Sequence, residues 1–369
     1  MISSLNHPTN PQTTTVDPTD DPPLLPGLPN HLAQTCLSTV PPSLLSAVCR
    51  QWRRLIYTPH FPPFLSLYAI VANNNTDSTR LSGSVAFFNF DPISSKWTAL
   101  PDPPPLRFLH RHPSFISRNL TIQSLTVSDR LVLIAATGHD FLPALSHPLV
   151  FDPIAGEWIL GPPLSDPRRW CAAGSIGGAV YVASGVGARY RGDVARRVER
   201  WDVKRRRLQW EEVAAMNDGR FSREAVEAVG YKGKLCMVNV KGNVVYNSLI
   251  LYWRPVGEDG GRNAFTVERP GGVADEEVMY VVDEEKGAVR KYDDENDRWE
   301  EVVDGSELLK GAEQMAVGGG KICVVSGGGR RITVVDVLAE PVKMWAVDPP
   351  LPENEVISVH ILSRPSKSL

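Results

Sequence analysis

Residues 150–158 read Val-Phe-Asp-Pro-Ile-Ala-Gly-Glu-Trp: apolar residues, an aspartate and, six positions after it, a tryptophan. Similar segments, in which an apolar residue precedes Asp and a Trp follows, occur at 89–97, 200–210, 291–299 and 334–345. The tryptophans lie at positions 97, 158, 210, 299 and 345, so successive gaps are 61, 52, 89 and 46 residues. Because 89 residues is close to two units of about 45, we expect one more unit between the third and fourth tryptophans. The chain therefore carries an internal repeat of about 50 residues.

A tight turn followed by an apolar run accompanies these segments. It reads Gly-Gly-Ala-Val-Tyr-Val at 177–182, Lys-Gly-Lys-Leu-Cys-Met at 232–237 and Gly-Gly-Lys-Ile-Cys-Val at 319–324, with weaker copies at 128–133 and 276–281. Glycine permits the positive φ that a sharp strand reversal requires, and residues 65–362 show almost no helical periodicity. The pattern predicts short antiparallel strands, with the tryptophans packed between adjacent sheets.

The turn, the apolar run and the later Asp and Trp together resemble the kelch repeat. This resemblance implies a mainly β fold, a β-propeller of six four-stranded blades over residues 65–369. The fourth unit, at about 216–262, lacks the Asp and Trp element, so we expect the fourth blade to diverge. The C-terminal run at 356–362 belongs to no repeat of its own. We expect it to pair with residues 64–72 in the first blade, which closes the ring and removes an open sheet edge.

The first 64 residues differ from the repeats. Residues 1–23 are dominated by Pro, Thr, Asn and Asp, and this composition predicts a disordered tail. In residues 24–64, a short helical pattern opens at Leu28-Pro29, residues 40–43 break the chain, and a longer helical pattern follows over 44–56. Helices this apolar cannot bury their own side chains within about 40 residues. They need a partner surface, either elsewhere in the chain or on another protein.

The order of Leu28-Pro29, Val40-Pro41 and a Cys-x-x-Trp-Arg sequence at 49–53 resembles the F-box. The other interpretation is a helical hairpin that packs on the neighbouring domain. The F-box resemblance implies docking onto the Skp-type adaptor and, through it, onto the cullin and RING subunits of a ubiquitin ligase. It assigns the adaptor contact to nine residues: Leu28, Pro29, Leu32, Leu37, Val40, Pro41, Leu44, Val48 and Trp52. Apolar anchors around a central aromatic are typical of helix-in-groove recognition.

An F-box at 24–64 followed by kelch repeats resembles the plant F-box/kelch proteins of the Skp-interacting-partner type. The resemblance implies the substrate-recognition subunit of an SCF-type E3 ubiquitin ligase, which captures a protein target for ubiquitination and degradation. A subunit of this kind needs no catalytic residue, metal or cofactor of its own. A kelch scaffold that serves no ligase is the alternative function.

The histidines and glycine runs of the repeat region give no catalytic pattern. A copper site of the galactose-oxidase type would need two His and two Tyr that converge on the propeller axis, with a Cys beside one Tyr. The repeat region has histidines only at 110, 112, 139, 147 and 360, and none of them recurs at a blade-periodic position. The glycine runs at 318–320 and 327–329 open no helix, so they predict hairpin turns and not phosphate-binding loops. We therefore expect no enzymatic activity from this chain.

The composition argues against several other classes of protein. The net charge of −3, from 39 Lys and Arg against 42 Asp and Glu, argues against nucleic acid as the main partner. No run of 18 apolar residues exists, so we expect no membrane span. The first residues lack the basic and apolar regions of a signal peptide. Five cysteines without Cys-x-x-Cys spacing are typical of reduced thiols in the cytoplasm or nucleus.

Three cations lie nine residues before a turn pair of the repeat: Arg168, Arg223 and Lys310. The kelch resemblance implies that residues at the start of each inner strand point toward the face where loops contact a target. We therefore expect a basic ring around the mouth of the central channel, which favours an acidic or phosphorylated target segment. The alternative is that the three are ordinary strand-start cations paired with nearby carboxylates.

Overall fold

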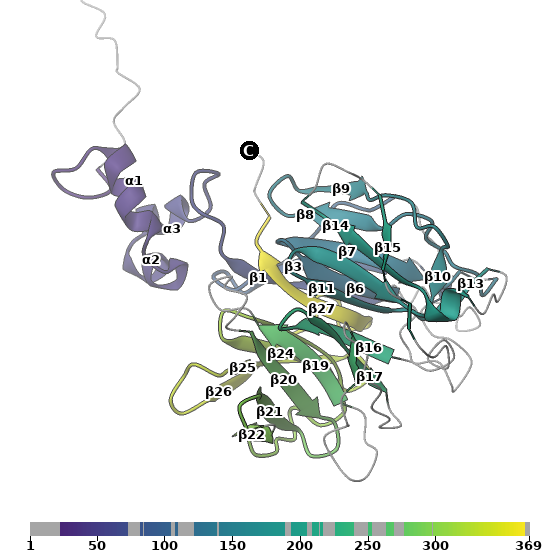
Figure 1. The fold of residues 1–369 in the computed structure, drawn as a ribbon. Helices are drawn as coiled ribbons and strands as arrows, with labels where there is room; N and C mark the ends of the chain where they lie inside the picture. Colours follow the sequence, from purple (N-terminus) through teal and green to yellow (C-terminus); the bar gives the residue numbers. More distant parts are fainter. Residues whose placement is uncertain are drawn as a thin grey trace, which may run out of the picture. The chain divides into compact units, whose positions relative to one another are not determined.

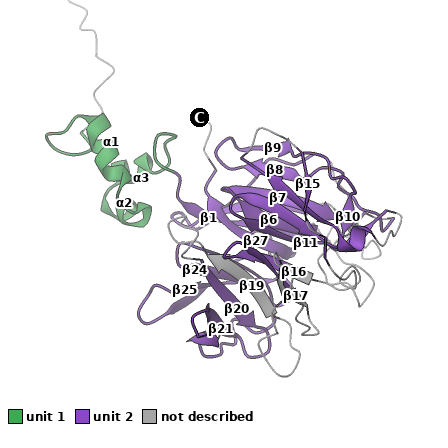
Figure 2. Ribbon diagram, viewed as in Figure 1, with its two compact units in different colours: residues 1–62 green, residues 63–369 purple. Residues whose placement is uncertain are grey.

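Two compact units divide the chain in the computed structural model, Met1–Pro62 and Pro63–Leu369 (Figure 2). The division lies two residues before the boundary expected after residue 64. The structure describes residues 23–72, 82–83, 85–104, 108–109, 122–138, 140–188, 193–204, 209–213, 215–216, 226–239, 250–252, 263–268, 277–296 and 298–365. The predicted tail therefore lies outside the described residues, except for Pro23.

The described residues of unit 1 form three short helices (Figure 1): α1 at Asn30–Ser38, α2 at Pro42–Val48 and α3 at Arg50–Leu55. The single longer helix expected over 44–56 is wrong, because Cys49 has an extended backbone with φ −154° and ψ 168° and separates α2 from α3. The Cys49 Sγ atom accepts a hydrogen bond from the Trp52 backbone N–H at 3.4 Å and so caps α3. None of the helices in the described part of the chain is long and apolar enough to span a membrane.

Unit 2 is built from β-strands that form a propeller (Figure 1). Among the described residues, five of its sheets have four antiparallel strands. The first sheet contains β1 (Leu65–Ala72), β3 (Val85–Asp91), β4 (Lys96–Ala99) and β27 (Glu355–Ser363). The second contains β6 (Ile122–Val127), β7 (Arg130–Ala136), β8 (Leu149–Asp152) and β9 (Glu157–Leu160). The third contains β11 (Ala172–Ile176), β12 (Ala179–Ala183), β14 (Val198–Asp202) and β15 (Glu211–Val213).

The next sheet in chain order departs from this pattern. It pairs β16 (Val226–Tyr231) with β17 (Lys234–Asn239), and β17 with β18 (Ile250–Tyr252) in parallel instead of antiparallel. The two last four-stranded sheets follow: β19 (Asn263–Glu268), β20 (Val278–Asp283), β21 (Ala288–Asp293) and β22 (Arg298–Val303), then β23 (Ala312–Gly318), β24 (Lys321–Ser326), β25 (Arg331–Asp336) and β26 (Lys343–Val347). Two small ribbons pair β2 (Ser82–Gly83) with β5 (Phe108–Leu109), and β10 (Arg168–Arg169) with β13 (Val186–Gly187). A 3-10 turn, η1, covers Val194–Arg196.

The ends of unit 2 meet in the first sheet, as the sequence predicted. The last strand, β27, pairs antiparallel with β1 in a register that runs from Leu65 opposite Ser363 to Ala72 opposite Glu355. The edge strand β27 is in contact with β6 of the second sheet and with β23 of the last one. The first strands β6, β11, β16, β19 and β23 contact one another in that order. The ring is therefore held closed by hydrogen bonds between the two ends of the propeller sequence, in which β27 covers the edge that β1 would otherwise leave unpaired.

The aspartate of each repeat closes the turn after the third strand of its sheet. Its Oδ1 atom accepts a backbone N–H two residues later: Asp91 from Ile93 at 2.9 Å, Asp152 from Ile154 at 3.0 Å and Asp336 from Leu338 at 3.2 Å. An Asx turn of this kind mimics a backbone turn, so the aspartate fixes the chain reversal into the last strand.

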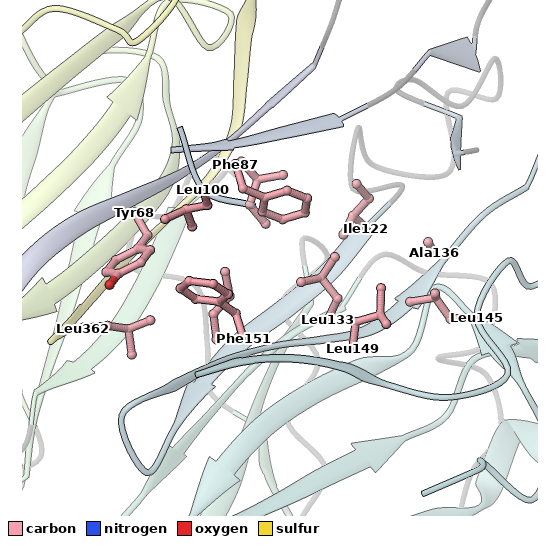
Figure 3. Packing of buried hydrophobic residues seen from close by; sticks show 12 residues of the cluster. Tyr68, Phe87, Leu100, Ile122, Leu133, Ala136, Leu145, Leu149, Phe151 and Leu362 are labelled. Atoms are coloured by element: carbon pink, nitrogen blue, oxygen red, sulfur yellow. The ribbon is translucent and has the colours of Figure 1, made fainter. Parts of the chain in front are cut away.

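The repeat tryptophans link neighbouring sheets. Three indole N–H groups donate to a backbone carbonyl that follows the last strand of the preceding sheet: Trp97 to Asp348 at 2.7 Å, Trp158 to Pro101 at 2.8 Å and Trp210 to Pro162 at 3.1 Å. The Trp158 ring lies 4.7 Å from Phe87 and 5.2 Å from Phe151. Figure 3 shows the core beside it, where side chains of the first sheet face Leu133, Leu149 and Phe151 of the second. The predicted packing of these three tryptophans between sheets is confirmed.

Trp345 is an exception, and its assignment to the repeat is wrong. In the first two sheets the residue opposite the tryptophan is the one just before the repeat aspartate, Phe90 or Phe151. In the last sheet the residue just before the aspartate is Val335, and it lies opposite Met344. Trp345 is one residue further along the strand, opposite Val334. Because side chains alternate between the two faces of a strand, this offset places Trp345 on the opposite face, where it is 41% exposed.

Candidate functional site

Unit 1 exposes a group of large apolar side chains that its own core leaves uncovered. Leu28 is 38% exposed, Leu32 47%, and Leu44 and Val48 are each 60% exposed. Pro29 and Pro41, which precede α1 and α2, are also exposed. The buried apolar residues of the unit are a different set: Ala33, Leu37, Leu45, Leu55, Ile56 and Phe61. Side chains of this kind exposed together are typical of a protein-binding surface. We call Leu28, Pro29, Leu32, Pro41, Leu44 and Val48 the apolar face.

Three other residues of the expected contact set are less available. Leu37 is only 3% exposed and belongs to the core of unit 1. Val40 is half-buried. Trp52 is half-buried as well, and its Nε1–H donates to the Leu24 carbonyl at 2.8 Å, while the Leu24 N–H donates to Asn30 Oδ1 at 3.0 Å. The indole therefore fastens the segment that enters α1 onto α3.

The Cys-x-x-Trp-Arg sequence serves mainly as the internal frame of unit 1. Cys49 caps α3, and Arg53 crosses back to α2, where its Nε and Nη2 atoms donate to the Ser46 carbonyl at 2.9 and 2.7 Å. These bonds satisfy a carbonyl near the end of α2 that has no partner within so short a helix. The motif thus holds α2, which carries Leu44 and Val48, against α3. The sequence pattern identified these residues without showing which of them face inward.

The three cations expected around the channel mouth have different environments. Arg168 is completely buried, and its Nη2 atom pairs with the Glu199 carboxylate, while its Nε and Nη1 atoms donate to main-chain carbonyls. A buried and paired guanidinium is not available to a target, so Arg168 is the structural cation that the sequence left as the alternative. Lys310 is exposed and pairs with Glu307. Arg223 lies outside the described residues.

Arg168 and its neighbours instead hold loops together at one end of the third sheet. The guanidinium joins the Asp166 and Ser184 carbonyls at 3.2 and 3.3 Å, and the nearby Arg197 pairs with the carboxylate of Asp166. The contacts connect residues 161–171 with residues 184–197. Glu199 is also buried, and its carboxylate neutralises the positive charge of the Arg168 guanidinium. This neutralisation allows the guanidinium to be buried.

The adjoining loop of the second sheet, residues 137–148, presents two apolar side chains. Phe141 is 36% and Leu142 39% exposed. The loop is held by the Gly138 N–H, which donates to the Leu142 carbonyl at 2.8 Å, and by the Leu142 N–H, which donates to Asp140 Oδ1 at 3.0 Å. Phe141 has φ of 60°, a conformation that is strained for an aromatic residue. A fixed loop with exposed apolar residues suits protein binding, and no sequence pattern identified it.

The cysteines divide between the two units. Burial raises the pKa of Cys171 to about 11 and that of Cys323 to about 12, which keeps both thiols protonated and unreactive near neutral pH. Cys36 and Cys49, which lie in unit 1, are exposed. The described residues contain no group of three or more His, Cys, Asp or Glu side chains arranged to hold a metal ion.

Comparison with known proteins places the repeats in a family. No family model matches the chain. A curated protein, the F-box/kelch-repeat protein SKIP25 of Arabidopsis thaliana, is 48% identical over 366 residues, which cover 93% of this chain and 90% of the relative. The chain belongs to the F-box/kelch-repeat family. The tandem sheets of unit 2 are thus the kelch repeats of an F-box/kelch-repeat protein; among the described residues, five of them carry the Asx turn and three the indole hydrogen bond to the neighbouring sheet.

Proposed function

We propose that this F-box/kelch-repeat protein is the substrate-recognition subunit of an SCF-type E3 ubiquitin ligase. In this proposal unit 1 is the F-box, its apolar face docks onto the Skp-type adaptor, and the cullin and RING subunits are reached through that adaptor. The subunit itself is non-catalytic. The exposure of Leu44 and Val48 carries the proposal, because a helical segment of about 40 residues gains little stability alone, and here it leaves these two large apolar side chains exposed.

We further propose that unit 2 is a six-bladed propeller that captures the protein target. The contacts from β27 through β6, β11, β16, β19 and β23 back to β27 support six blades, with the three-stranded sheet as the divergent fourth. Target capture is assigned to the end of the propeller that carries loops 137–148 and 184–197, since Phe141 and Leu142 are exposed there. Lys310 remains a candidate contact.

Adaptor binding by the full-length chain is the direct test. Leu44→Asp and Val48→Asp each place a charge on the apolar face without touching the core of unit 1. We expect each to weaken binding to purified Skp-type adaptor by about 30-fold or more, the loss of about 2 kcal/mol that is typical of a central anchor. Isothermal titration calorimetry or biolayer interferometry measures the dissociation constant.

Leu338→Asp is the matched control, because Leu338 is 75% exposed but belongs to unit 2; its adaptor affinity should stay within about twofold of wild type. Trp52→Ala is a poorer probe, since it also removes the hydrogen bond to Leu24. If the wild-type chain fails to bind the adaptor, or if Leu44→Asp and Val48→Asp bind like wild type, the ligase function is wrong. A kelch scaffold without a ligase would then be the better description.

A further inference from the structure

The segment that carries the apolar face has an unusual charge composition. Residues 24–64 contain three arginines and no aspartate or glutamate. At the chain's average of 42 acidic residues in 369, a segment of 41 residues would contain about five. The nearest carboxylates in the sequence, Asp20 and Asp21, precede this segment and lie outside the described residues. Residues 24–64 are therefore basic, although the whole chain has a net charge of −3.

All three arginines are on α3, and their environments differ. Arg53 is engaged with the Ser46 carbonyl. Arg50 and Arg54 are exposed, and neither forms an ion pair with any residue that the structure describes. Long side chains that are charged, exposed and unpaired remain free to meet a partner's charges.

Arg50 follows the apolar face in the sequence. Val48, Cys49 and Arg50 are consecutive and all exposed, so an exposed cation lies two residues after the last apolar residue of α2. An interface that combines an apolar centre with a charged, solvent-accessible rim has the anatomy of ordinary protein complexes. The partner of such a rim must be negatively charged, because like charges set opposite each other across an interface cost several kcal/mol.

We propose that Arg50 and Arg54 form a basic rim that steers an acidic surface of the adaptor onto the apolar face. The proposal rests on the proposed function and adds the chemistry of the partner surface. Rim charges in an aqueous setting act mainly on the association rate constant, since they attract the partner before contact and remain solvated afterwards. The apolar anchors Leu44 and Val48 instead set the dissociation rate constant.

Stopped-flow association of the full-length chain with the Skp-type adaptor separates these roles. Arg50→Glu combined with Arg54→Glu should lower the association rate constant about tenfold at an ionic strength of about 50 mM, and change the dissociation rate constant by less than about twofold. At about 500 mM salt the wild type and the variant should converge, because the Debye length then falls below the reach of the rim charges. Far-ultraviolet circular dichroism checks that the helices persist.

The matched control is the double variant Lys96→Glu and Arg330→Glu, which reverses two exposed cations of unit 2. It changes the net charge of the chain by the same amount as the arginine variant, but at positions far from Arg50 and Arg54 in the sequence. An unchanged rate constant in the arginine variant, or an equal fall in the control, overturns the basic rim while leaving the adaptor function intact. If Leu44→Asp also has no effect, or the wild type does not bind, the proposed function fails and the rim fails with it.

Discussion

Acidification should destabilise the closed ring through His360 on the closing strand β27. The imidazole is 7% exposed, and its Nε2 atom lies 2.9 Å from Ser124 Oγ of the second sheet and 3.1 Å from Ser358 Oγ. Tyr68, opposite it in the register, is also buried, which raises its pKa and keeps it neutral. Burial lowers the pKa of His360 from 6.5 to about 4, because the charged form would lose its hydration.

The sign and size of the effect follow from that difference. The unfolded chain binds the proton more tightly than the folded chain does, so the stabilising contribution is complete above pH 6.5 and is lost as the pH falls toward 4. One pKa unit corresponds to about 1.4 kcal/mol, so the loss attributable to this residue is about 2 kcal/mol at pH 5 and about 3 kcal/mol at pH 4.

Urea denaturation of the wild type and of His360→Gln, followed by tryptophan fluorescence at several pH values, isolates this contribution from that of the carboxylates. Glutamine can still hydrogen-bond to the serines but does not titrate. The free energy of unfolding of the wild type, relative to that of the variant, should fall by about 3 kcal/mol between pH 7 and pH 4. A difference between the two proteins that does not vary with pH would refute the reasoning.

Three further substitutions test the propeller. Trp158→Phe removes the indole N–H that joins two sheets and should cost about 1 kcal/mol of unfolding free energy, whereas Trp345→Phe, on the exposed face of its strand, should cost about half that or less by the same urea titration. Glu199→Ala leaves the Arg168 guanidinium buried without its carboxylate and should cost about 3 to 5 kcal/mol; a loss below about 1 kcal/mol would mean that the pair is not buried in solution. Phe141→Ser should reduce the number and amount of proteins that co-purify with the chain from cells treated with a proteasome inhibitor, while adaptor binding stays unchanged. If the same proteins are captured in the same amounts, the target-binding site does not include Phe141.

Much of the propeller could be predicted from the sequence because its signals are local. An aspartate accepts an N–H two residues away, so the Asx turn at Asp152 is encoded within a few positions. The C-terminal run belongs to no repeat, so the sequence predicted that it adds a strand to the first sheet. The structure shows this strand as β27, paired with β1. The same local logic failed at Trp345, where the spacing from Asp336 is nine residues instead of the six between Asp152 and Trp158. An odd difference in spacing reverses the face of a strand.

The sequence by itself determined the two-part organisation, the repeat and the closing strand, since apolar periodicity and turn chemistry depend only on neighbouring residues. Only the tertiary structure decided which side chains are available. Arg168 and Arg50 are each the first residue of a short element, yet one is buried against Glu199 and the other is exposed. Leu37 and Leu44 are both leucines of the expected contact set, and one lies in the core while the other lies on the apolar face. Burial depends on residues that are distant in the chain, such as the 31 positions that separate Arg168 from Glu199, and spacing along the sequence does not record that proximity.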